Sequence, residues 1–187
     1  MKDLVTILIG GGSCSGKSTF ASLVQHAVVL SMDHFYLGKS QLTPDAQGRY
    51  DFDAPNSVDL GAFAEAIKTL SVRKPATIPI YDMKVSERTG KQIIKVPEEA
   101  KFLVVEGIFV FEPEIRELGD LKIYIDAPPE IRVARRMVRD VEKGRSHIDT
   151  LEWSIIVEKN HKKFVEPLKK YADIIIPFSY NPVQFGS

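Results

Sequence analysis

The sequence has little cysteine, with one residue among 187, and no long hydrophobic run. The single cysteine, Cys14, cannot form an internal disulfide, so we expect a reducing, cytoplasmic setting and no disulfide-stabilised scaffold. The apolar runs at 102–105 and 174–176 are far shorter than the roughly 20 residues that a membrane-spanning helix needs. Residues 1–4 lead straight into a strand-like run without a small-residue cleavage site, so we expect no secretory signal.

An excess of charge of either sign is also absent, because 25 Lys and Arg balance 25 Asp and Glu. No global field attracts nucleic acid or an anionic membrane, so an anionic ligand has to be held by a local cluster. We therefore expect a small-molecule substrate, with neither nucleic acid nor a membrane as partner, and a homo-oligomer stays open. With 44% apolar and 27% charged residues, the composition is that of an ordinary globular domain.

Short aliphatic runs recur along the chain without the apolar–polar alternation of a half-exposed sheet. Continuous apolar runs are typical of strands buried on both faces, as in a parallel sheet. Segments with helical spacing separate the runs, which predicts an α/β fold with a doubly wound parallel sheet in a single domain, 1–187. The predicted strands are 5–9, 28–30, 102–105, 122–125 and 173–176, and the predicted helices lie at 18–26, 60–70, 131–138 and around 153–157.

Two regions do not fit this alternation. Residues 38–59 are polar and predict a long loop, and loops of that length inside a domain are usually functional or disordered. Residues 78–96 predict a small hairpin whose turn is Glu87–Gly90, with the glycine in the turn. We expect both regions at the edge of the core, where substrate-binding additions lie.

Residues 11–18 match the phosphate-binding pattern G-x-x-x-x-G-K-[S/T] between an apolar strand and a helix. Glycines let backbone N–H groups converge on an anion, and the positive end of the helix adds to that field. Lys17 offers a point charge to the terminal phosphates of ATP or GTP, and Ser18 offers a hydroxyl to Mg²⁺. The alternative is a glycine-rich turn with a chance Lys-Ser pair. The predicted nucleotide-binding residues are Gly11, Gly12, Ser13, Cys14, Ser15, Gly16, Lys17, Ser18 and Thr19.

Two carboxylates follow predicted strands, Glu106 after 102–105 and Asp33 after 28–30. The carboxyl ends of parallel strands face the ligand, so both are expected near the phosphate loop. Glu106 is a candidate partner of Mg²⁺, direct or through water, and Asp33 is a candidate base for an attacking hydroxyl. The plainer interpretations are a surface acid for Glu106 and a helix N-cap for Asp33.

A cluster of basic residues lies between 129 and 145, before Gly144 breaks the predicted helix. Arginine pairs with phosphate oxygens and stays charged, so we interpret 129–150 as a lid that closes over the transferred group and excludes water. The alternative is a solvated face with internal ion pairs, and Arg132 fits that alternative best. The cluster comprises Arg132, Arg135, Arg136, Arg139, Lys143 and Arg145, the four arginines 132–139 sharing one face.

Further short motifs follow one another in a characteristic order: Asp33–Tyr36, Tyr50–Pro55, Ile80–Asp82, Val105–Ile108, Arg135–Asp140 and Phe164–Pro167. Together they resemble the uridine kinase family, the uridine–cytidine kinases with their phosphoribulokinase relatives. The resemblance implies a P-loop kinase that transfers a phosphoryl group from ATP to the 5′-hydroxyl of uridine or cytidine. It further implies catalysis by Asp33, Lys17 and Arg139, Mg²⁺ held by Ser18 and Glu106, and substrate bound by Tyr36, Asp53, Tyr81 and Arg136.

The family's Tyr-Asp-Phe-x-x-His pattern reads Tyr-Asp-Met-Lys-Val-Ser at 81–86, so a stacking aromatic and a base-reading histidine are replaced. Another riboside or a sugar phosphate is therefore an alternative acceptor, and a sugar phosphate would want an extra cation such as Lys84 or Arg88. A nucleotide-binding module without catalysis is a further alternative. It would be expected to lack Asp33 or Lys17, and both are present.

Overall fold

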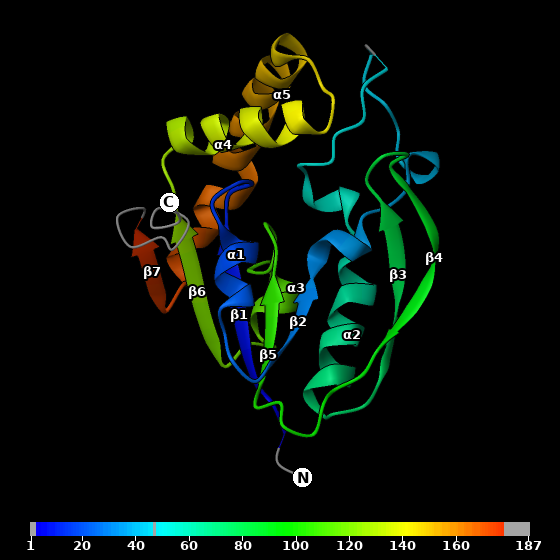
Figure 1. The fold of residues 1–187 in the computed structure, drawn as a ribbon, viewed down its shortest axis with the longest axis vertical. Coiled ribbons are helices and arrows are strands. Elements are labelled where there is room, and N and C mark those ends of the chain that lie inside the picture. Colours follow the sequence, from blue (N-terminus) through cyan, green and yellow to red (C-terminus); the bar gives the residue numbers. More distant parts are fainter. Residues whose placement is uncertain (1–2, 47, 178–187) are drawn as a thin grey trace.

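The structure, a computed structural model, describes residues 3–46 and 48–177. It contains a parallel five-stranded sheet of strand order β2-β5-β1-β6-β7 and an antiparallel pair, β3-β4 (Figure 1). The predicted parallel sheet is confirmed, and its strands lie within two residues of the predicted bounds. The strands are β1 (Val5–Gly11), β2 (Ala27–Ser31), β3 (Ala76–Asp82), β4 (Glu87–Ile94), β5 (Phe102–Glu106), β6 (Leu121–Asp126) and β7 (Ile174–Pro177).

The predicted helices are also confirmed, except that the first ends early. Leu23 donates its N–H to the Phe20 carbonyl in a tighter turn, and His26 takes a left-handed φ of 54° that leads the chain into β2. Within the described residues, no helix is both long and apolar enough to cross a membrane. The helices are α1 (Lys17–Ser22), α2 (Leu60–Ser71), α3 (Pro113–Arg116), α4 (Pro129–Glu142) and α5 (His147–Asn160), which continues as a π-helical turn (His161–Val165) and a 3₁₀ helix (Glu166–Tyr171).

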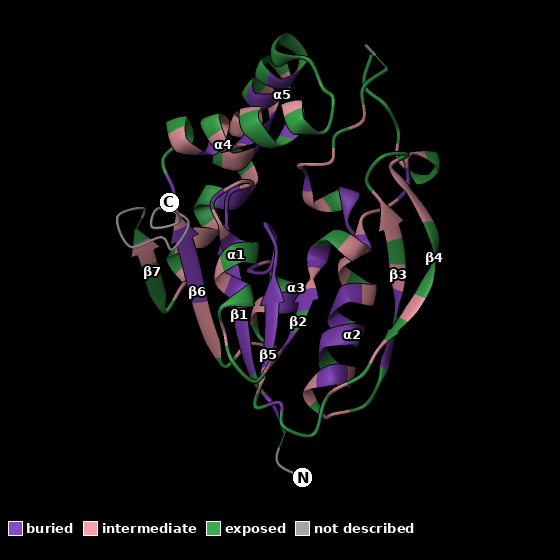
Figure 2. Cartoon of the chain, viewed as in Figure 1, coloured by how far each residue is buried: buried purple, intermediate pink, exposed green. Residues whose placement is uncertain are grey.

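Side chains of the central strands alternate between two hydrophobic cores. In β1, Leu8 joins the core that contains Phe63 of α2, whereas Ile7 and Ile9 join the core that contains Ala21 of α1. Figure 2 shows β1 and β5 buried along most of their length. Because both faces are covered, apolar residues fill consecutive positions, which explains the uninterrupted apolar runs in the sequence.

The hairpin turn predicted at Glu87–Gly90 is wrong, because these residues lie inside β4, where Gly90 is part of the ladder. The chain turns at 83–86 instead. The Asp82 carboxylate accepts the backbone N–H of Lys84 at 2.8 Å, and this local hydrogen bond fixes the reversal without a glycine. The hairpin itself is confirmed beside α2, and the described residues of 38–59, all but residue 47, form a loop with short 3₁₀ turns (Figure 1).

The carboxyl ends of the parallel strands bring distant segments together. In the sheet register, Glu106 of β5 pairs with Ile9 of β1 on one side and with Ser31 of β2 on the other. The segments that follow these strands therefore start side by side at one edge. Helices α4 and α5 lie above this edge (Figure 1).

Candidate active site

The loop between β1 and α1 has the geometry expected for binding phosphate. Gly16 adopts φ +105°, a conformation open to glycine, so that the N–H groups opening α1 follow a tight turn. Lys17 is 7% exposed and donates from Nζ to the Gly12 carbonyl at 2.8 Å. The residues predicted to bind nucleotide, 11–19, thus form one continuous loop and first helical turn, with Ser18 exposed.

Glu106 ends β5 beside this loop and is 5% exposed. Burial lowers the pKa of Lys17, and the negative charges of Glu106 and Asp33 oppose that shift. The Glu106 carboxylate also accepts a hydrogen bond from Ser31 Oγ at 2.5 Å. Glu106 is therefore buried and bonded within the site, and the interpretation as a surface acid is wrong.

Asp33 lies in the 3₁₀ turn Met32–Phe35 that follows β2. Asp33 is accessible to solvent. Desolvation by the protein around it, together with the nearby charge of Glu106, raises the pKa of Asp33 to about 6, while Lys17 and Arg139 act in the opposite direction. The N-cap of the turn is Ser31, whose Oγ accepts the Asp33 N–H at 3.3 Å. The N-cap interpretation of Asp33 is therefore wrong, and its carboxylate is left to face the site.

Ser31 is a residue that reasoning from the sequence missed. Its hydroxyl donates to Glu106 and accepts from the backbone of Asp33, so one side chain links two carboxylate-bearing segments that lie far apart in the sequence. The signal was a serine at the end of a predicted strand, two residues before Asp33. That position is shared by many serines without such partners, so the pairing became visible only in the folded chain.

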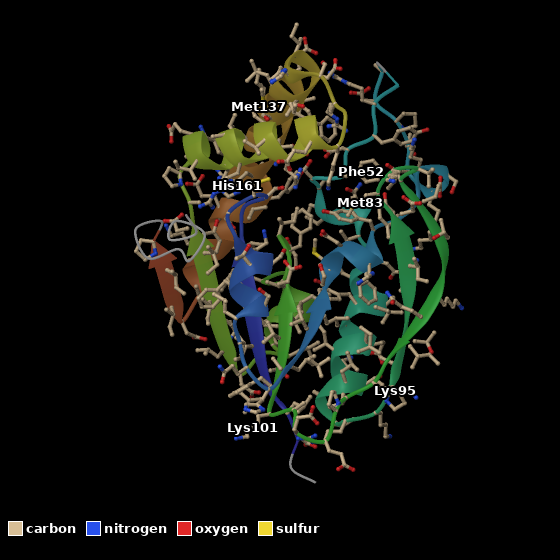
Figure 3. All side chains as sticks on the ribbon, in the orientation of Figure 1. Phe52, Met83, Lys95, Lys101, Met137 and His161 are labelled. Carbon is tan, nitrogen blue, oxygen red and sulfur yellow. The ribbon has the colours of Figure 1, made fainter. Side chains whose placement is uncertain are left out.

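Aromatic rings gather beside Asp33. The centroids of Tyr36 and Tyr81 are 5.6 Å apart, and Phe52 packs edge-on against Tyr36 at 6.1 Å. Burial raises the pKa of Tyr36, and the charges of Asp33 and Asp53 contribute, which places this ring near both carboxylates. Phe52 was missed as a candidate although it stands inside a quoted motif. Figure 3 labels it near the hairpin end that carries Met83.

Asp53 faces the arginines of α4. Burial raises the pKa of Asp53 to about 6, and the positive charge of Arg136 is the largest effect opposing that shift. Arg136 itself is 4% exposed. Arg139 forms an ion pair with Asp140 at 2.8 Å and contributes positive charge at Asp33. Arg136, predicted to bind substrate, thus lies near Asp53, and Arg139, predicted to be catalytic, lies near Asp33.

The four arginines of α4 differ in exposure: Arg132 and Arg136 are buried and Arg135 is half-buried, whereas Arg139 is exposed. Arg135 donates to the Ser15 carbonyl at 3.0 Å, which ties α4 to the phosphate loop. Arg132, expected to be solvated, is buried and pairs with Glu158 of α5 at 2.5 Å. The internal ion pair of Arg132 was anticipated, but its burial was not; α5 and the phosphate loop cover this side chain.

Arg132 lies against Gly12 so closely that any side chain at position 12 would overlap its guanidinium. The Arg132 Nε and Nη1 groups are buried and have no hydrogen-bond partner among the described residues. Unpaired buried donors are costly, and an anion or water commonly satisfies them. Arg132 thus stays among the candidates for contact with phosphate, although it was the member of the cluster that fitted the solvated alternative best.

Arg88 is engaged within the protein and is not free to bind the phosphate of a sugar-phosphate acceptor. It donates to the carbonyl oxygens of Phe35 and Tyr36 at 2.9 Å each, and it lies 3.4 Å from Asp59. These bonds fasten β4 to the turn after β2. Lys84 is exposed on the hairpin turn.

Ser18 and Glu106 are the predicted Mg²⁺-binding residues. Among residues 3–46 and 48–177, no group of three or more His, Cys, Asp or Glu side chains could hold a metal ion. Mg²⁺ in phosphate sites keeps several waters and takes one or two carboxylates together with phosphate oxygens. One hydroxyl and one buried carboxylate at the phosphate loop fit that mode of binding.

Comparison with known proteins agrees with this geometry. The model described as "Phosphoribulokinase / Uridine kinase family" matches residues 6–181. The chain belongs to this family. The uridine kinase of Clostridium tetani is 38% identical over 183 residues, which cover 91% of this chain and 86% of that protein. The resemblance inferred from the motifs is thereby confirmed.

Two solved structures of this kinase class share the fold. Phosphoribulokinase from Rhodobacter spheroides has a TM-score of 0.68 at 16% identity, covering 95% of this chain and 71% of that chain. A possible uridine kinase from Bacillus stearothermophilus has a TM-score of 0.63 at 18% identity, covering 94% and 90%. The predicted P-loop kinase fold is therefore confirmed.

Proposed function

We propose that this member of the phosphoribulokinase/uridine kinase family transfers the terminal phosphoryl group of ATP, or of GTP, to the 5′-hydroxyl of uridine or cytidine. The observation that carries the proposal is the position of Asp33. The charges of Lys17 and Glu106, on the phosphate side, change the pKa of Asp33. The charge of Asp33 in turn contributes to the raised pKa of Tyr36, on the aromatic side. A base placed between a phosphate loop and a cluster of aromatic rings suits transfer to a hydroxyl.

The acceptor is held, in this proposal, by Tyr36, Tyr81 and Asp53. The two rings, with Phe52, provide apolar surface for the nucleoside, and the Asp53 carboxylate accepts hydrogen bonds from the ribose 2′- and 3′-hydroxyls. Arg136 faces Asp53 and keeps a positive charge beside it. The 5′-hydroxyl is thereby directed toward Asp33.

In the transfer step, the 5′-oxygen forms a bond to phosphorus while the bond from phosphorus to the leaving nucleoside diphosphate breaks. The hydroxyl proton passes to a carboxylate oxygen of Asp33. Lys17 and Arg139 stabilise negative charge on the phosphoryl oxygens, and Arg132 supplies two further N–H donors above the loop. Ser18 and Glu106 would hold Mg²⁺, which neutralises charge between the phosphates when it is bound.

A sugar-phosphate acceptor is the second candidate, and a specific observation disfavours it. Arg88, one of the two hairpin cations predicted for such an acceptor, is bonded to two backbone carbonyls and lies against Asp59. A nucleoside needs no such cation. ATP consumption should therefore be measured with uridine, cytidine, adenosine, ribose 5-phosphate and ribulose 5-phosphate, with 5′-monophosphate identified as product. Activity confined to the sugar phosphates would contradict the proposal.

We expect Ser31→Ala to lower kcat about tenfold, because a hydrogen bond to a charged group is typically worth about 1.5–3 kcal/mol. Without the hydroxyl, Glu106 loses a donor and the turn that carries Asp33 loses its cap. The Mg²⁺ concentration that gives half the maximal rate should rise as well. Ser31→Thr keeps the hydroxyl and serves as control. Equal rates and equal Mg²⁺ dependence in Ser31→Ala and the unaltered protein would refute this role.

We expect the ribose to matter more than the base. Met83 and Ser86 stand where the family pattern has an aromatic ring and a histidine, so no imidazole is present there for the edge of the base. Met83 is 52% exposed, and Ser86 interacts with Tyr81. Removal of the 2′-hydroxyl takes a donor away from Asp53 and should reduce kcat/KM by about 10²-fold, more than exchange of uracil for adenine. The measurement is kcat/KM for uridine, cytidine, adenosine and deoxyuridine.

The double variant Met83→Phe/Ser86→His provides the matched comparison. Residue 86 has φ 56°, and histidine tolerates this region better than most residues do. The variant should prefer pyrimidine over purine ribosides more strongly than the unaltered protein does. Strong uridine selectivity in the unaltered protein would contradict the prediction.

A further inference from the structure

A buried amide joins the loop 38–59, called here the acceptor loop, to the last residue of α5. Asn160 closes α5, is 7% exposed, and donates from Nδ2 to both carboxylate oxygens of Asp51, at 2.8 and 2.9 Å. The two residues are 109 positions apart in the sequence. The next residue, His161, is labelled in Figure 3 between α4 and the sheet. The contact therefore ties the loop 38–59 to the helical pair above the site.

The same carboxylate also shapes the backbone at Asp53. The Asp51 Oδ1 atom accepts the Asp53 N–H at 2.9 Å, a local turn that sets the direction of residue 53. Asp51 is thus bonded to α5 on one side and to its own loop on the other. Across the site, Arg136 of α4 faces the Asp53 carboxylate. Helix α5 is therefore hydrogen-bonded to the segment Asp51–Asp53, and Arg136 of α4 lies close enough to Asp53 to lower its pKa.

The hydrogen bond between residues 51 and 160 requires a carboxylate at one position and an amide at the other. The Asp51 carboxylate accepts bonds from one amide and one backbone N–H, so that each of its oxygens accepts at least one bond. A carboxylate at position 160, which is buried, would lie against the carboxylate of the exposed Asp51, and like charges at this distance repel. An amide at position 51 opposite a carboxylate at 160 would reverse the hydrogen bond and still leave Oδ1 for the Asp53 N–H.

We propose that Asn160 and Asp51 form a latch that positions Asp53 for the acceptor and couples the acceptor loop to α5. The proposal rests on the proposed function in assigning the ribose hydroxyls to Asp53. Asn160 is a positioning residue, since it acts through Asp51 and does not touch the reacting atoms. Loosening the latch should weaken acceptor binding far more than donor binding.

The test compares the unaltered protein with Asn160→Asp, Asp51→Asn and the exchanged pair Asn160→Asp/Asp51→Asn. Asn160→Asp should raise KM for uridine by about 10–100-fold, with kcat and KM for ATP changed less than about threefold. The exchanged pair should return KM for uridine to within about threefold of the unaltered value, because the hydrogen bond is rebuilt in reverse. Failure of the exchange to restore KM, or an unchanged KM in Asn160→Asp, would overturn the latch.

A matched control and a substrate-free measurement separate this proposal from the proposed function. Asn56→Asp makes the same chemical change at an exposed site of the same loop and should leave KM for uridine unchanged. Hydrogen exchange of the Asp53 amide should become at least about tenfold faster in Asn160→Asp and slow again in the exchanged pair. If no riboside is phosphorylated, the proposed function is wrong, but the hydrogen-exchange rates of the Asp53 amide still test the latch. Equal exchange rates in all variants would overturn the latch.

Discussion

Asp33→Asn is expected to lower kcat by about 10²–10⁴-fold while nucleotide affinity stays within about threefold, because the amide keeps the shape of the carboxylate but accepts no proton. The turn that carries residue 33 should persist, since Ser31 caps it through the backbone N–H. Steady-state rates with saturating uridine, together with calorimetric binding of a non-hydrolysable ATP analogue, provide the measurement.

The control for this variant is Asp3→Asn, an exposed residue before β1, at the opposite edge of the sheet from the site. It should retain the full rate. A tenfold loss of nucleotide affinity in Asp33→Asn with an unchanged kcat would instead place Asp33 in the metal shell alone.

The pH profile of the unaltered protein tests the same assignment. Desolvation and the charge of Glu106 raise the pKa of Asp33 to about 6. A base must be ionised to accept a proton, so the rate should be full above that pKa, half at about pH 6, and fall about tenfold per pH unit below it. The acidic limb should be absent from Asp33→Asn. Asp53 has a similarly raised pKa, and its protonation should show in KM for uridine instead.

The parts of the fold that the sequence predicted well are those set by local pattern. Continuous apolar runs marked β1 and β5, because strands covered on both faces need apolar residues at consecutive positions. The phosphate loop was equally clear, since its glycines and Lys17 have few other uses in that order. The hairpin turn was misplaced because Gly90 is a strong turn signal, whereas the real turn rests on the Asp82 side chain.

The parts that could not be predicted depend on contacts between distant segments. Ser31 reaches a carboxylate 75 residues away, and Asn160 reaches one 109 residues away, so neither pair leaves a periodic trace in the sequence. Arg132 was assigned to solvent because helical spacing says which residues share a face but not what covers it. Burial against Gly12 and α5 decided that question.

Lys17→Met is expected to abolish turnover, with kcat reduced by about 10³-fold or more, because a cation at the transferred phosphoryl group supplies much of the stabilisation in this chemistry. Methionine keeps most of the length of the side chain, so the packing at this buried position changes little. The loss of one hydrogen bond, from Nζ to the Gly12 carbonyl, should alter the free energy of unfolding by only about 1 kcal/mol. Activity is therefore expected to fall without a comparable loss of stability.

Rates and thermal unfolding should be measured on the same preparations of Lys17→Met, Lys17→Arg and Lys91→Met. Lys91 is exposed on β4, so its replacement should leave both properties unchanged. Arginine restores the charge at position 17, but a planar guanidinium does not fit where the ammonium is 7% exposed and bonded to Gly12, so it should not restore the rate. A melting temperature within about 4 °C of the unaltered protein, with activity lost, would show that position 17 serves phosphate rather than packing. Turnover at the unaltered rate in Lys17→Met would show that the phosphate loop is not the site of transfer.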